Sequence, residues 1–175
     1  TRVRSSAASD VYKRQQYLQY NGGHEWRVNA VANAAANSAI TFTTAMFVCN
    51  NGNIASGVGT SASGAFSNAF GYYSCATGEK SSALAYYSCA TGACSWASGY
   101  AAKATGLESS ASGYKATASG SNSTASGHYS SATAIKTAAF GVYVTASGCY
   151  SNAFGYHSCT GTEAGGKFAT ALGFR

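Results

Sequence analysis

From Ile54 to Ser158 the chain divides into fifteen consecutive seven-residue units with no insertion between them. The second residue of every unit is Ala, and the seventh is small in nearly all of them. The fourth residue is Gly in thirteen units, and Ala85 and Ala134 stand at this position in the other two. A fixed period of this kind indicates stacked supersecondary units, each of which covers a face of its neighbour.

The glycines exclude a coiled coil, although a seven-residue period is also typical of one. Each Gly costs about 1 kcal/mol relative to Ala in a helix interior, and a helix would contain one in almost every unit. The units therefore predict a β-solenoid in which positions one to three are extended and Gly at position four supplies a turn or a close backbone approach. Successive side chains of a strand point to opposite faces, so the Ala at position two predicts a thin interior.

The larger side chains double the structural period to fourteen residues, because alternate units differ in kind. Units numbered odd from Ile54 hold apolar residues at positions one or three, which we predict to form an oligomer interface: Ile54, Phe70, Leu84, Trp96, Phe140 and Phe154. Even-numbered units hold Ser or Thr at position three, which we predict to form an exposed polar wall: Ser63, Thr77, Thr91, Thr105, Ser119, Thr133 and Ser147. An apolar wall of this length exceeds what soluble monomers usually expose, so we expect it to pack against copies of itself.

The unit x-Ala-x-Gly-x-x-Ser resembles the YadA-like head repeats of trimeric autotransporter adhesins, over about 60 % of the chain. The resemblance implies an all-β, left-handed parallel β-roll with fourteen residues per coil, assembled as a homotrimer on a cell surface. It also implies an extracellular adhesive role, with the chain itself and host surface, matrix or glycan ligands as partners. Similar repeats occur in phage and viral fibres, so a virion tail-fibre shaft remains an alternative.

Three segments lie outside the repeat. Residues 5–15, SSAASDVYKRQ, resemble a translated sequencing adapter from an environmental assembly, so we expect residues 1–15 to be non-native. In residues 16–53, Asn21-Gly22-Gly23 predicts a hairpin that caps the roll, followed by irregular first coils. Residues 159–175 are expected to break the register and then resume the roll as a truncated continuation.

Composition argues against an enzyme and against a nucleic-acid-binding protein. Only 9 % of the residues are charged, and removing the four basic residues and Asp10 of segment 1–15 lowers the formal charge from +6 to +3. Little positive charge then remains for nucleic acid. No other Asp occurs, so no Ser-His-Asp set can form, and we expect neither catalysis nor a cofactor. The sequence contains no run of 18 apolar residues, so we expect no membrane insertion by this segment.

The cysteines and the hydroxyl wall each leave alternatives open. Cys75 and Cys89 occupy position one of successive even units, about 4.8 Å apart in a parallel stack. They form either an axial or inter-chain disulfide or remain free thiols that fill their rank. No Cys-x-x-Cys spacing indicates a metal site. The hydroxyl wall could bind ice or carry glycans in a secreted filament, or simply be a solvent-compatible surface. The tyrosine-rich turns either stack as ladders or provide platforms for sugars.

Overall fold

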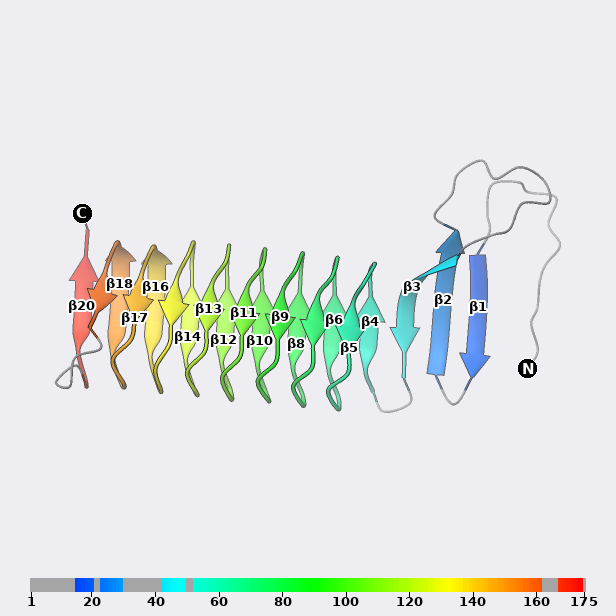
Figure 1. Ribbon diagram of the computed structural model, residues 1–175, viewed down its shortest axis with the longest axis horizontal. Coiled ribbons are helices and arrows are strands. Elements are labelled where there is room, and N and C mark those ends of the chain that lie inside the picture. Colours follow the sequence, from blue (N-terminus) through cyan, green and yellow to red (C-terminus); the bar gives the residue numbers. More distant parts are fainter. Residues whose placement is uncertain (1–14, 21–22, 30–41, 50–51, 162–166, 175) are drawn as a thin grey trace.

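The structure is a computed structural model that describes residues 15–20, 23–29, 42–49, 52–161 and 167–174. Within these ranges the chain is an all-β, parallel β-solenoid without a helix, as the repeat predicts. Two sheets form the long walls of a flattened tube, with β1 at one end and β20 at the other (Figure 1).

Alternate units belong to opposite sheets, so the prediction of two distinct walls is confirmed. Sheet A contains the strands of the odd-numbered units: β4 (Ile54–Ser56), β6 (Asn68–Phe70), β8 (Ser82–Leu84), β10 (Trp96–Ser98), β12 (Ser110–Ser112), β14 (Thr124–Ser126), β16 (Ala138–Val142) and β18 (Asn152–Tyr156), then β20 (Thr170–Gly173). Sheet B contains β5 (Ser61–Ala62), β7 (Cys75–Ala76), β9 (Cys89–Ala90), β11 (Lys103–Ala104), β13 (Thr117–Ala118), β15 (Ser131–Ala132), β17 (Thr145–Ala146) and β19 (Cys159–Thr160). Residues fourteen apart are direct partners of neighbouring parallel strands, as for Ala97 and Ala111.

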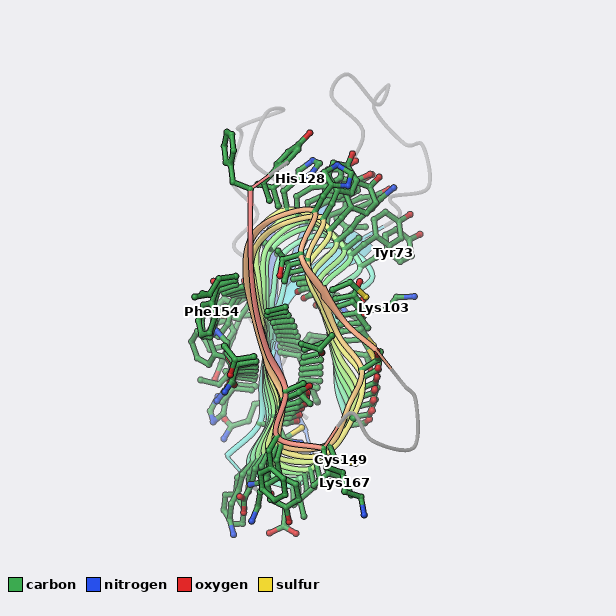
Figure 2. All side chains as sticks on the ribbon, turned by 90° about the vertical axis from the view of Figure 1, so that its left-hand side faces the viewer. Tyr73, Lys103, His128, Cys149, Phe154 and Lys167 are labelled. Carbon is green, nitrogen blue, oxygen red and sulfur yellow. The ribbon has the colours of Figure 1, made fainter. Side chains whose placement is uncertain are left out.

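The interior is a stack of alanines, which Figure 2 shows as rows of short side chains between the walls. Every position-two Ala from Ala69 to Ala153 is fully buried. The residue at position seven closes the coil, and its buried hydroxyl often donates a hydrogen bond to the carbonyl of position four. Examples are Ser81 to Gly78 and Ser109 to Gly106, each at 2.7 Å. These bonds satisfy polar groups that an alanine core could not.

Glycine at position four leaves room for the next coil on both sheets, and on sheet A it also has a second role. After the strands of sheet A it adopts a positive φ, between 111° at Gly155 and 134° at Gly141, and Ala85 stands at an equivalent position with φ 99°. After the strands of sheet B, a Cβ on Gly106 would lie 2.1 Å from the Gly120 carbonyl oxygen. The close approach occurs on sheet A too, where a Cβ on Gly141 would lie 1.9 Å from the Gly155 carbonyl oxygen. The two roles expected of this glycine therefore both occur.

Position six contains a left-handed conformation that the sequence did not indicate. From Phe66 to His157, all fourteen position-six residues are other than Gly and have φ between 52° and 58°. Each backbone N–H here from Tyr73 onward donates to the position-five carbonyl of the preceding coil, as Lys115 does to Tyr100 at 2.8 Å. Every turn is therefore held by the coil before it.

The N-terminal strands extend sheet A as an antiparallel meander. β1 (Gln15–Tyr20) and β2 (Gly23–Asn29) form the predicted hairpin, although its turn lies outside the described residues. β3 (Phe42–Val48) pairs antiparallel with both β2 and β4. β3 therefore continues sheet A instead of wrapping into sheet B, and residues 30–41, where irregular first coils were also expected, lie outside the described residues. Gln15, expected to be non-native, pairs with Val28, and residues 1–14 lie outside the described ranges.

The C-terminal end keeps the roll for longer than its repeat predicts. β19 pairs with β17, so the expected break does not begin at Cys159. In β20, Ala171 is the partner of Ala153, and eighteen residues separate them where other coils have fourteen. Four extra residues in this coil account for the loss of the sequence register, and β20 is the expected continuation of the roll.

Candidate functional site

The roll offers four outer surfaces, which Figure 2 shows along the tube axis. The face of sheet A carries Phe154, and the opposite face of sheet B carries Lys103. The turns that follow sheet A form one edge, where Tyr73 and His128 lie. The turns that follow sheet B form the other edge, which includes Cys149. The candidate functional residues are distributed over these surfaces.

The predicted interface residues lie on the outer face of sheet A, in two groups. We call Phe70, Leu84 and Trp96, on β6 to β10, the N-terminal apolar patch, and Ile54 on β4 lies next to it, half-buried. We call Phe140, Phe154 and Leu172, on β16 to β20, the C-terminal apolar patch. The rings of Phe140 and Phe154 stack with centroids 5.5 Å apart. Trp96 is 45 % exposed, and Phe70 and Phe140 are each 38 % exposed.

Serines separate the two apolar patches. Ser112 on β12 and Ser126 on β14 occupy position three of the coils between them, and Ser98 occupies it on β10 beside Trp96. The face is therefore apolar at both ends and polar in the middle, and does not form one continuous apolar wall. Leu172 is the member that the sequence analysis missed, because the four extra residues hide its register. The Ala-Leu-Gly triplet at 171–173 is the signal that could have identified it.

The predicted polar wall lies on the outer face of sheet B. Its position-three hydroxyls are exposed from Ser63 to Thr133, and Ser147 is half-buried. A second outward rank, at position one, runs beside them. This rank is mixed: Ser61, Cys75, Cys89, Lys103, Thr117, Ser131, Thr145 and Cys159. Both outward ranks hold hydroxyls only in the coils of β5, β13, β15 and β17.

Aromatic side chains form ladders along the edge that follows sheet A. At position five, Tyr72, Tyr86, Tyr100, Tyr114 and His128 stack with successive centroids 5.0 to 5.2 Å apart. At position six, Tyr73 stacks on Tyr87, and Tyr129 stacks on Tyr143. Because the rings cover one another's faces, this arrangement favours an edge-sealing ladder over a platform on which sugars would stack.

Lys115 links the two aromatic ladders. Its Nζ donates a 3.0 Å hydrogen bond to the Tyr129 hydroxyl and lies 5.4 Å from the centroid of the Tyr114 ring. This hydrogen bond lowers the pKa of Tyr129 and raises the pKa of Lys115. The pair therefore favours a tyrosinate next to an ammonium at alkaline pH.

Cys75 and Cys89 are direct partners on β7 and β9, and both are half-buried free thiols. Burial raises the pKa of Cys89 to about 11, and the neighbouring Cys75 thiol adds to the rise. No bond joins the two sulfurs in the single chain, and an axial or inter-chain disulfide stays a prediction. Within the described residues, no group of three or more His, Cys, Asp or Glu side chains could hold a metal ion. Over the same ranges, no helix is long and apolar enough to cross a membrane.

Comparison with known proteins gives a distant likeness of fold. No family model matches the chain, and no curated protein matches it. The chain is similar to the solved structure of the collagen-binding domain of the Yersinia adhesin YadA. The TM-score is 0.46 at 24 % sequence identity, covering 62 % of this chain and 70 % of that chain.

Proposed function

We propose that this chain is a β-roll segment of a homotrimeric, extracellular fibre, with a structural and adhesive rather than catalytic role. The observation that carries the proposal is the position of the apolar residues on sheet A. Phe70, Trp96 and Phe140 project from one face and are 38 to 45 % exposed in the single chain. Aligned apolar groups of this kind mark protein interaction sites. Three copies packed around an axis parallel to the roll would cover both apolar patches.

Burial of the apolar patches would favour association. Complete burial of a Phe or Leu side chain contributes about 1.5 to 3 kcal/mol. A side chain that starts 38 to 45 % exposed would therefore contribute about 1 kcal/mol. The six residues of the two patches would then contribute roughly 5 kcal/mol per chain.

The mass of the chain in solution tests the trimer. We expect light scattering after size exclusion to give about 53 kDa at micromolar concentration, three times the 17.7 kDa chain. Phe70→Ser combined with Leu84→Ser should shift the protein towards monomer, and Ser is compatible with the fold because Ser98 and Ser112 occupy equivalent positions. Thr91→Ser on sheet B is the matched control and should stay trimeric. A monomeric parent protein would contradict the proposal.

Adhesion would come from many weak contacts along the Ser/Thr face and the tyrosine edge. Repeated sites on three linked chains raise the effective affinity by about 100-fold or more without a strong single pocket. Immobilised collagen and a glycan array are suitable probes, and the trimer should be retained much longer than the monomeric variant. A trimer that binds none of these surfaces would contradict the adhesive role and leave the architecture intact.

A second candidate function is ice binding by sheet B. Three successive coils present hydroxyls in both outward ranks, as a regular in-register array: Thr117 and Ser119, Ser131 and Thr133, Thr145 and Ser147. Measurement of thermal hysteresis tests it. The parent protein should show a freezing-point gap that Thr133→Lys removes, and no gap in the parent would exclude this function.

A further inference from the structure

Two cysteine thiols on sheet B have no role in either proposed function. Cys75 and Cys89 occupy the same outward position in successive coils and are direct register partners. Both thiols are free and half-buried. The third cysteine of this rank, Cys159, is paired with Thr145 and lies at the far end of the sheet. Among the described strands, Cys75 and Cys89 are the one Cys–Cys register pair.

The spacing of parallel strands places these sulfurs too far apart for a direct bond in the sheet. Strands lie about 4.8 Å apart, and in-register side chains of a parallel sheet leave the backbone in the same direction. The two Cβ atoms are therefore also separated by about 4.8 Å, whereas a disulfide requires about 3.8 Å between them. A disulfide would force the two strands to move together and would disturb the ladder on both sides.

The same spacing suits an atom placed between the two sulfurs. With the zinc–sulfur bond length of about 2.3 Å as a guide, a two-coordinate ion with collinear ligands needs sulfurs about 4.6 Å apart. We propose that Cys75 and Cys89 form a two-thiolate site that binds copper(I). Soft thiolate ligands select this ion. On binding, each thiol releases a proton and its sulfur donates an electron pair to the metal, so no oxidant or reductant takes part.

The surroundings of the pair fit a soft monovalent ion better than a hard divalent one. No carboxylate occurs in any strand of sheet B, and the exposed residues directly after β7 and β9 are Thr77 and Thr91. Mg²⁺ and Ca²⁺ would lack the oxygen ligands they require. Lys103 is the register partner of Cys89 on the next strand. Its positive charge compensates the net negative charge that two thiolates and one copper(I) ion carry.

Anaerobic competition between the reduced full chain and a coloured copper(I) chelator tests the site. We expect one tightly bound equivalent per chain, and protection of Cys75 and Cys89 from alkylation as measured by mass spectrometry. Cys75→Ser and Cys89→Ser should each weaken binding at least 100-fold. Both variants should fold, because Ser61 and Ser131 occupy the same rank in the native chain. Cys94→Ser is the matched control, since Cys94 is an exposed thiol in a turn, and it should change the affinity less than twofold.

Three results would overturn the proposal. One is a copper stoichiometry that falls equally with the loss of any cysteine, because that indicates independent single thiols. Another is unchanged affinity in Cys89→Ser. The third is a mass 2 Da lower than that of the reduced chain together with a linked peptide joining Cys75 to Cys89, because that identifies a disulfide.

Discussion

Gly106→Ala is the sharpest test of how closely the coils are stacked. Gly106 follows β11 on sheet B, where the backbone does not need a glycine conformation. The added Cβ would lie 2.1 Å from the carbonyl oxygen and 2.5 Å from the carbonyl carbon of Gly120 in the next coil. Both distances are far below van der Waals contact with backbone atoms that have no rotamer to change. The next coil must therefore move.

The chain contains one natural example of a methyl group at this position of an even-numbered unit, Ala134. The even-unit glycines from Gly64 to Gly120 each donate a hydrogen bond of 3.3 to 3.4 Å to an Ala carbonyl of the next coil, as Gly106 does to Ala118. Ala134 occupies the same position, and in this described part of the chain its N–H makes no such bond to Ala146. The methyl group of Ala134 thus coincides with the loss of this hydrogen bond, while the neighbouring bond from Thr133 to Ala146 is kept at 3.0 Å.

The expected loss follows from three contributions. Overpacking costs about 1 to 3 kcal/mol, and loss of a long hydrogen bond costs about 0.5 kcal/mol. Ala restricts the unfolded chain more than Gly does, which offsets about 0.4 to 1 kcal/mol. We expect Gly106→Ala to lower the free energy of unfolding by about 2 kcal/mol, and Tm by roughly 4 to 8 °C for a chain of this length.

Urea unfolding followed by circular dichroism, at one fixed chain concentration, measures the effect. Ala134→Gly is the reverse change. It relieves the close contact and regains a hydrogen bond but frees the unfolded chain, so by the same contributions its free energy of unfolding should rise by about 2 kcal/mol. If both variants stay within about 0.5 kcal/mol of the parent, which is the value of the hydrogen bond alone, the close approach of successive coils does not explain the glycines of sheet B.

Two further changes test individual positions. Ala85→Gly should raise the urea midpoint, with a gain of about 1 kcal/mol, because a residue other than Gly at φ 99° is strained. A lower midpoint would show that Ala85 is not strained. Lys115→Met should return the pKa of Tyr129 towards its ordinary value of 10.0, which an ultraviolet titration of tyrosinate measures. Because folding lowers the pKa of Tyr129, its tyrosinate form stabilises the fold at pH values above that pKa. Because folding raises the pKa of Lys115, its ammonium form stabilises the fold until the pH exceeds the raised pKa. The variant should therefore lose most stability near pH 10, and an equal loss at pH 7 would contradict this.

The strict period made the walls of the roll predictable. Ala97 and Ala111 meet nearly the same neighbours one coil apart, so a local rule derived for one unit holds for the next. Alternation of side-chain direction then places every position-two Ala inside and the large residues outside. The two separate apolar patches could also have been derived, because Ser98, Ser112 and Ser126 stand between them in the sequence.

The ends were harder to predict because strand partners are not specified locally. β3 could have entered either sheet, and its antiparallel pairing with β4 depends on the hydrogen-bonding edge that β4 presents. Leu172 joins the C-terminal apolar patch only after four extra residues are taken out of the register. Neither the pairing of β3 nor the register of Leu172 is marked by a repeating pattern of side chains, so the sequence did not predict them.

The turns explain why the roll requires many coils. A residue other than Gly in the left-handed region costs about 1 to 2 kcal/mol, and fourteen position-six residues adopt it. An isolated coil would bear this cost without its main compensation, which is the hydrogen bond from the position-six N–H to the preceding coil, 2.8 Å long at Tyr143. Each coil is therefore stable only on a coil already formed, as in other repeat proteins. The antiparallel meander of β1 to β3 pairs with β4 through β3 and so covers the edge that the first coil would otherwise leave open.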